Sequence, residues 1–182
     1  MKSVLISIQP KWCELIANGS KTIEVRKTKP KLDVPFKVYI YCTKGREPNV
    51  LFKWCKSNNF LKAEYTALNG KVIGEFVCDY IEDFKEFEYG IDVLHRHIKL
   101  NACINYGEIY DYLGFKKCGY GWHISNLVIY DKPKPLSKFV GGCKYPWDCG
   151  ACCYYDREQF TCDKPIRPPQ SWCYVESEVD TE

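Results

Sequence analysis

The stretch ISIQPKWCELIANGSKTIEVRK, at residues 6–27, decides the fold of this chain. Residues 3–8 alternate and are rich in Val, Leu and Ile, which predicts a strand. Pro10 predicts the start of a short helix, because proline is favoured at the first helical position, and Gly19 predicts its end. Residues 21–26 alternate again with a period of two. The chain therefore opens with a strand, a helix, a tight turn and a second strand.

The second strand is expected to have a core face and a polar face. Its alternation places Ile23 and Val25 on one face and Thr22, Glu24 and Arg26 on the other. An arginine can pair with a phosphate or a base edge through two hydrogen bonds, and a glutamate can accept a base amino group or transfer protons. We therefore expect a ligand cleft on the polar face. The alternative is a surface ion pair between Glu24 and Arg26 with no ligand.

Lys21 stands at the junction between the turn and the second strand. Strict alternation puts it on the core face with Ile23, but the twist at a strand end can redirect it into the cleft. A lysine there can act as a point charge, or as a base or nucleophile if it is desolvated. Lys21 is therefore the residue that separates a binding protein from an enzyme.

Three tryptophans accompany this polar block. Trp12, Trp122 and Trp172 lie in segments that a barrel would bring close together, and tryptophan rings stack on bases of any identity. The alternative role for each ring is core packing. His123 can titrate near neutral pH and is a further candidate ligand residue, with a structural role as its alternative.

The rest of the chain reads as short strands with one further helix and without regular alternation of the two. We expect strands at residues 37–42, 70–78, 122–130 and 171–176 and a helix at residues 106–113. Residues 81–99 have no clean period and give no prediction. This pattern favours an α+β fold in which a mixed β-barrel, open or closed, carries peripheral helices.

Six of the twelve cysteines crowd into residues 143–173. Four thiolates at short spacing, including a C-x-x-C pair, are what a tetrahedral Zn²⁺ needs, and a metal can organise a segment that lacks a core of its own. The segment therefore predicts a small zinc knuckle with a structural Zn²⁺; the alternatives are free thiols or a redox C-x-x-C. The expected ligands are Cys143, Cys149, Cys152 and Cys162.

Composition predicts a soluble cytoplasmic protein with one main domain. With 46% hydrophobic residues the chain can bury a core, and it shows neither an export signal nor a membrane-length apolar stretch. Residues 1–62 carry 13 Lys and Arg against 4 Asp and Glu, a possible footprint for phosphates or simply a solvated basic surface. We expect a barrel at 1–140, the knuckle at 141–166, a final strand at 167–176 and a disordered acidic tail at 177–182.

The N-terminal stretch resembles the ASCH domain family, through residues 6–10, the helix at 11–17 and the G-x-K-T-x-E-x-R block at 19–26. Other stretches also look like the family members found in bacteria and phages; they lie at residues 70–76, 119–133 and 167–176. The resemblance implies a PUA-like β-barrel with a cleft beside the polar block and a link to RNA or nucleotides. Members that deacylate N4-acetylcytidine have a lysine matching Lys21 but a threonine where this chain has Glu24.

The sequence leads us to expect a protein that binds RNA, a nucleotide or a modified nucleoside in the cleft, without contact with membranes. One alternative is a hydrolase that acts on a modified nucleoside or a ribonuclease, with Lys21, Glu24 and Glu75 as its available catalytic groups. Another alternative is a nucleotide-sequestering or regulatory interaction protein of phage type.

Overall fold

The chain begins with the predicted unit of strand, helix and strand. In the computed structural model these elements are β1 (Lys2–Ile8), α1 (Pro10–Ala17) and β2 (Ile23–Arg26). Pro10 occupies the start of the helix, where its missing N–H needs no partner. Gly19 follows the helix with a φ of 80°, a conformation that favours glycine and ends the helix.

The structure describes part of the chain, and every structural statement below refers to that part. The described residues are 2–44, 53–54, 66–67, 69–85, 97, 99–114, 118–139, 155–156, 161–162 and 167–176.

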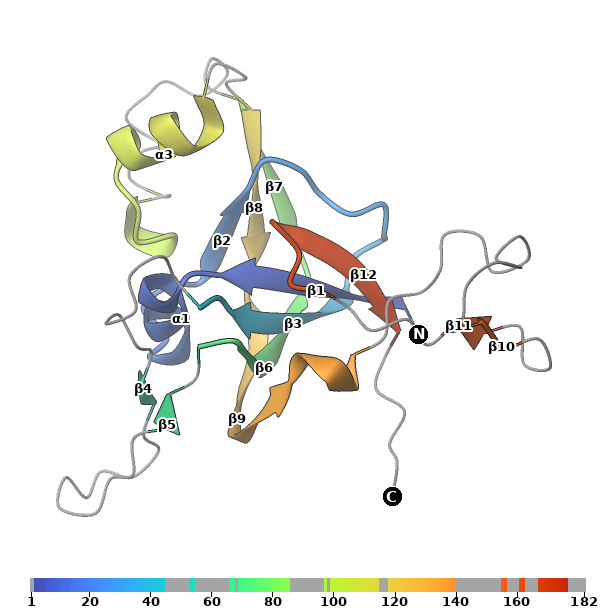
Figure 1. Cartoon of the computed structure of the whole chain (residues 1–182). Helices are drawn as coiled ribbons and strands as arrows, with labels where there is room; N and C mark the ends of the chain where they lie inside the picture. The colour runs from blue at the N-terminus through green and yellow to red at the C-terminus, as the bar shows by residue number, and fades with distance from the viewer. Residues whose placement is uncertain are drawn as a thin grey trace, which may run out of the picture.

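The largest sheet has five strands in the order β12-β1-β3-β6-β9 (Figure 1). Strands β1 and β3 run parallel, and the other neighbouring strands run antiparallel. Its central strands are nearly all buried, whereas β9 at the edge alternates between half-buried and exposed residues. The bounds of the new strands are β3 (Phe36–Cys42), β6 (Lys71–Cys78), β9 (Ser125–Pro135) and β12 (Trp172–Glu176).

A second sheet has three antiparallel strands in the order β2-β8-β7, with β7 (Ile81–Lys85) and β8 (Cys118–His123). The helix α3 (Tyr106–Leu113) lies beside it (Figure 1). The remaining described elements are the strand pairs β4 (Lys53–Trp54) with β5 (Thr66–Ala67) and β10 (Tyr155–Asp156) with β11 (Thr161–Cys162), and a short 3-10 helix η2 (Leu136–Lys138).

The α+β class is confirmed, but the described strands do not close into a barrel. The prediction of one strand at residues 122–130 is wrong, and the break in that segment shows how the two larger sheets separate. Strand β8 ends at His123, Ile124 donates its N–H to the carbonyl of Thr22, and β9 begins in the other sheet. Asn126, just inside β9, has a φ of 47° and lies at an irregularity of the pairing with β6, where the register shifts between Val77–Ser125 and Glu75–Val128.

The core lies on both faces of the five-stranded sheet. Val4, Ile6 and Ile8 of β1 point to the face covered by α1, whereas Leu5 packs on the opposite face with Phe139. This alternation is the period of two that the sequence shows in β1. A smaller cluster joins β2 to α3; its buried members are Ile23, Val25, Ala102 and Leu113.

Candidate functional site

A cavity of about 870 Å³ lies where the first strand, helix α1 and β2 meet. Its wall comes from the end of β1, the start of α1, β2, the residues after β3, the region of α3 and the segment before β12. The residues lining it are Ser7, Ile8, Gln9, Pro10, Lys11, Trp12, Lys21, Glu24, Val25, Arg26, Thr43, Lys44, Ile104, Tyr112, Pro169 and Gln170. The predicted polar block thus forms part of a real cavity.

Lys21 lies in the wall of this cavity because the chain has not yet entered strand geometry. Its N–H bonds to the carbonyl of Leu15 at 2.8 Å, which holds it to the end of α1, and β2 begins two residues later. The side chain is only 3% exposed, and its Nζ donates to the carbonyl oxygen of Ala102 at 2.7 Å. Local geometry therefore overrides the alternation that would place Lys21 with Ile23.

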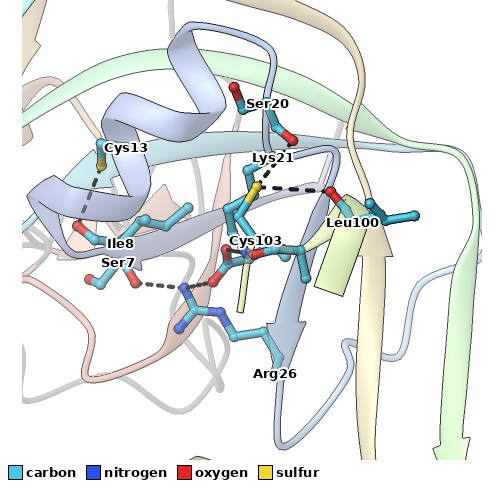
Figure 2. Close-up of polar contacts among 10 residues, drawn as sticks. Ser7, Ile8, Cys13, Ser20, Lys21, Arg26, Leu100 and Cys103 are labelled. Atoms are coloured by element: carbon cyan, nitrogen blue, oxygen red, sulfur yellow. Dashed lines mark hydrogen bonds and ion pairs between the residues drawn. The ribbon is translucent and has the colours of Figure 1, made fainter. Parts of the chain in front are cut away.

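Glu24 lies between two cations. Its Oε2 is 3.4 Å from Lys21 Nζ, and its Oε1 is 3.0 Å from Nη2 of Arg26. The same Nη2 donates to the carbonyl oxygen of Ser7 at 2.7 Å, so Arg26 ties β2 to the end of β1 (Figure 2). All three side chains are at least 92% buried. We call Lys21, Glu24 and Arg26 the charged trio.

The charged trio carries one more positive than negative charge. Glu24 Oε2 has no hydrogen-bond partner, although the Lys21 Nζ lies 3.4 Å from it. The Nε of Arg26 is also buried and has no hydrogen-bond partner. Buried polar groups are normally satisfied, so these two atoms call for an explanation, such as a catalytic role or a bound water or ion. The trio is therefore a poor candidate for an incidental surface pair.

The rim adds further positive charge and two aromatic rings. Lys11 and Lys44 line the cavity together with the trio, and Lys11 Nζ pairs with Glu108 at 3.4 Å. Among the lining residues that the structure describes, Glu24 is the one acid. Trp12 has Lys11 Nζ at 4.4 Å and Lys21 Nζ at 5.1 Å from its ring centroid. Tyr112 of α3 lies on the same cavity. The site can therefore offer both cations and flat apolar surfaces to a ligand.

Four of the predicted ligand residues do not line the cavity. Thr22 is occupied by Asn101, to whose Oδ1 its Oγ1 donates at 3.3 Å. His123 bonds through Nδ1 to Asp79 Oδ1 at 2.7 Å, a hydrogen bond that lowers the pKa of Asp79. The other two are the tryptophans Trp122 and Trp172.

These two tryptophans pack against each other, with ring centroids 5.9 Å apart. Trp122 is fully buried and also meets the ring of Phe36, so its place in the structure is the core. Trp172 is partly buried and donates its indole N–H to Thr28 Oγ1 at 3.0 Å. Of the three predicted tryptophans, Trp12 is the one that the structure brings to the cavity.

Several lining residues had no signal in the sequence. Ser7 contributes a main-chain carbonyl, which leaves no trace in residue type, and Tyr112 and Gln170 arrive from distant segments. Glu75 lies away from the cavity and bonds to Lys37 and Tyr130. Partial burial raises the pKa of Glu75, but these two hydrogen bonds together with the positive charges of Lys37 and Lys134 outweigh it and leave the pKa lowered.

The predicted zinc ligands cannot be placed. Cys143, Cys149 and Cys152 lie outside the described residues, and Cys162 is described only as part of the strand β11. Within the described ranges, no three or more His, Cys, Asp or Glu side chains gather in a way that could hold a metal ion. None of the helices in those ranges is long and apolar enough to cross a membrane.

The sequence of the chain matches the model of a known domain family. The model of the ASCH domain matches residues 6–132, which contain the charged trio and most of both larger sheets. The chain belongs to the ASCH domain family. The family is generally associated with RNA binding. No curated protein matches this ASCH chain.

Solved structures with a similar fold include an ASCH protein from Zymomonas mobilis. That structure has a TM-score of 0.59 and 16% sequence identity, and the match covers 96% of this chain and 88% of the other. Two variants of the same Zymomonas protein each have a TM-score of 0.58. The Ser to Ala variant is 15% identical, and its match covers 96% of this chain and 89% of the other. The Tyr to Phe variant is 16% identical, and its match covers 97% of this chain and 92% of the other. At this identity the likeness concerns the fold alone.

Proposed function

We propose that this ASCH protein binds RNA or a nucleotide in the cavity around Lys21, Glu24 and Arg26, and that it does so in the cytoplasm. The observation that carries the proposal is the buried net positive charge of the trio at the wall of the cavity. Keeping a charge out of water is costly unless a partner of opposite sign compensates it. The phosphate of a nucleotide is such a partner.

The size and lining of the cavity support the same ligand class. Small-molecule sites span about 300–1,000 Å³, and the volume of about 870 Å³ lies in that range. Trp12 and Tyr112 contribute aromatic rings to the lining, with lysine ammonium groups lying over both, and stacking a base on an aromatic side chain contributes about 1–3 kcal/mol. Lys44 adds a cation at the rim, where a phosphate chain would continue, whereas the nearby Lys11 is paired with Glu108 at 3.4 Å.

Calorimetric titration with 5′-mononucleotides and the matching nucleosides tests this proposal. We expect the nucleotides to bind more tightly, because a charge-assisted hydrogen bond contributes about 1.5–3 kcal/mol. Lys21→Ala should lose about 1–3 kcal/mol of nucleotide affinity, whereas Lys21→Arg keeps the charge and most of the affinity. The exposed Lys138, on an element that does not line the cavity, provides the control Lys138→Ala. Equal affinity for nucleotide and nucleoside would contradict the role given to the trio.

A second candidate function is hydrolysis of a modified nucleoside or of RNA in the same cavity. The observation that favours it is the contact between Lys21 Nζ and Glu24 Oε2, because a desolvated lysine beside a carboxylate can move a proton. Turnover of acetylated cytidine or short RNA by the wild type, lost in Lys21→Arg with binding retained, would support an enzyme. Turnover that survives in Lys21→Ala would remove Lys21 from the mechanism.

A further inference from the structure

A run of exposed lysines follows the charged trio directly. Residues 27–35 connect β2 to β3, and their first five positions read Lys-Thr-Lys-Pro-Lys. Lys27, Thr28, Lys29 and Lys31 are exposed, whereas Pro30 is buried and fixes the middle of the run against the protein. The three lysines therefore present their charge to solvent from an anchored segment. We call residues 27–31 the lysine segment.

The lysine segment is held in place by two aromatic side chains of β12. Thr28 Oγ1 accepts a hydrogen bond from the Trp172 indole, and the N–H of Lys31 donates to the Tyr174 hydroxyl at 2.8 Å. Figure 1 shows the connection passing close to β12, the strand that carries both aromatic residues. A surface that is already ordered loses less entropy when a partner binds.

Two of the three ammonium groups are available to a partner. Lys29 Nζ is 3.2 Å from Asp83, which neutralises it. Among the residues that the structure describes, Lys27 and Lys31 have no acidic partner within ion-pair distance. Lys27 Nζ instead lies 5.1 Å from the ring centroid of Tyr112.

The lysine segment begins at the rim of the cavity. Tyr112, which Lys27 covers, is itself a lining residue, and Lys27 directly follows the lining residue Arg26. From the other side, Gln170 lines the cavity two residues before Trp172, the residue that anchors Thr28. Positive charge and aromatic rings therefore continue from the cavity onto the outer surface without an intervening element.

We propose that the lysine segment is a track for the backbone of single-stranded RNA whose terminal or flipped nucleotide occupies the cavity. This inference rests on the proposed function and adds the length of the ligand to it. Five residues extend over at most about 18 Å, which is the rise of about five stacked nucleotides at about 3.4 Å each. A cationic groove that follows the backbone, next to aromatic rings, is the usual way in which proteins hold a single strand.

The test compares a long and a short ligand on the same variants. Fluorescence anisotropy measures the affinity for eight-nucleotide RNA homopolymers of the four bases, and calorimetry measures the affinity for the matching 5′-mononucleotides. The double variant Lys27→Gln with Lys31→Gln removes two charges and keeps side-chain length. Its matched control, Lys132→Gln with Lys138→Gln, removes two exposed lysines from β9 and η2, which do not line the cavity.

We expect the lysine-segment variant to lose octamer affinity in a salt-dependent way. Each neutralised phosphate contributes about 0.7 to the slope of log affinity against log salt for a single strand, so the slope should fall by about 1.4. If the proteins bind equally at about 1 M salt, this is a loss of about 25-fold at about 0.1 M. Mononucleotide affinity should fall by less than octamer affinity, because Lys27 lies over the cavity residue Tyr112 whereas Lys31 lies four residues further along the lysine segment. The control should match the wild type.

Two results would overturn the inference, and they are distinguishable. In the first, the wild type binds mononucleotides, but the octamers bind no more tightly or the slope of log affinity against log salt is the same in the variant. The lysine segment is then not a track, and the cavity proposal stands. If the wild type binds neither ligand, the proposed function fails and the track fails with it.

Discussion

Replacing Glu24 by glutamine tests whether the charged trio is a buried, interdependent unit. The substitution keeps the shape of the side chain and removes its charge, which leaves the Lys21 and Arg26 cations buried without a counter-charge. Each of the three side chains is at most 8% exposed, so solvent screens the two cations only weakly once the carboxylate charge is gone. Removing one partner of a buried ion pair costs about 3–5 kcal/mol.

The magnitude is large enough to measure by heat or denaturant. For a chain of this length, 1 kcal/mol moves the midpoint of thermal unfolding by about 2–4 °C, so Glu24→Gln should lower it by about 6–20 °C. The matched control is Asp83→Asn, which breaks an ion pair with Lys29 whose side chains are 45% and 53% exposed. That exposed pair should change the free energy of unfolding by less than about 1 kcal/mol.

A second variant separates charge from packing. Combining Glu24→Gln with Lys21→Met leaves a single net positive charge in the trio, on Arg26. Part of the lost stability should therefore return. The 3.4 Å contact between Lys21 Nζ and Glu24 Oε2 implies that the two sites are coupled, and we expect at least about 1 kcal/mol to be recovered. If Glu24→Gln and Asp83→Asn lower stability by the same small amount, water screens the charges of the trio. The trio then lacks the buried uncompensated charge on which the proposed function depends.

The C-terminal cysteine cluster, Gly74 and Glu75 each allow a further test. We propose that the C-terminal cysteine cluster binds one structural zinc; metal analysis should find about one Zn²⁺ per chain, and Cys149→Ser should release it. Gly74→Ala should destabilise the protein by about 1–3 kcal/mol in denaturant unfolding, because the new Cβ would lie 2.3 Å from the Val128 carbonyl oxygen, whereas Gly107→Ala, with 3.4 Å to its nearest neighbour, should not. Because its pKa is lowered in the folded state, the charged form of Glu75 stabilises the fold. This stabilisation is fully present above the unfolded pKa of about 4.3 and is lost as the pH falls through the folded pKa. Glu75→Gln should therefore lower stability at neutral pH and have no such effect in acid.

The sequence predicts the local elements well, because their signals are local. Proline at the start of α1, glycine after it and the period of two in β1 each depend on neighbouring residues alone. The same logic fails at residues 122–130, where composition is uniformly strand-like but the chain changes sheet at Ile124. Which sheet a residue joins depends on distant partners such as the Thr22 carbonyl, and no local pattern encodes that choice.

The candidate site divides along the same line. Glu24 and Arg26 were predictable because alternation places both on one face of β2, and the structure has them 3.0 Å apart. Trp122 and Trp172 were not separable from Trp12 by sequence, because a tryptophan that stacks on a ligand and one that fills a core have the same residue type. Only the tertiary structure shows that Trp122 is fully buried while Trp12 faces the cavity.

The charged trio and the rest of the cavity wall come from different parts of the chain. The charged trio lies within six consecutive residues, and its geometry is set by a helix end and one short strand. The opposite wall comes from separate segments, which contribute Lys44, Tyr112 and Gln170. Because the side chains of Lys44, Tyr112 and Gln170 are not among the hydrogen-bond partners described for the trio, substitutions there can change the shape of the cavity while the charge that attracts the ligand stays in place. Anion attraction is therefore expected to depend on the trio, and discrimination between bases on the opposite wall.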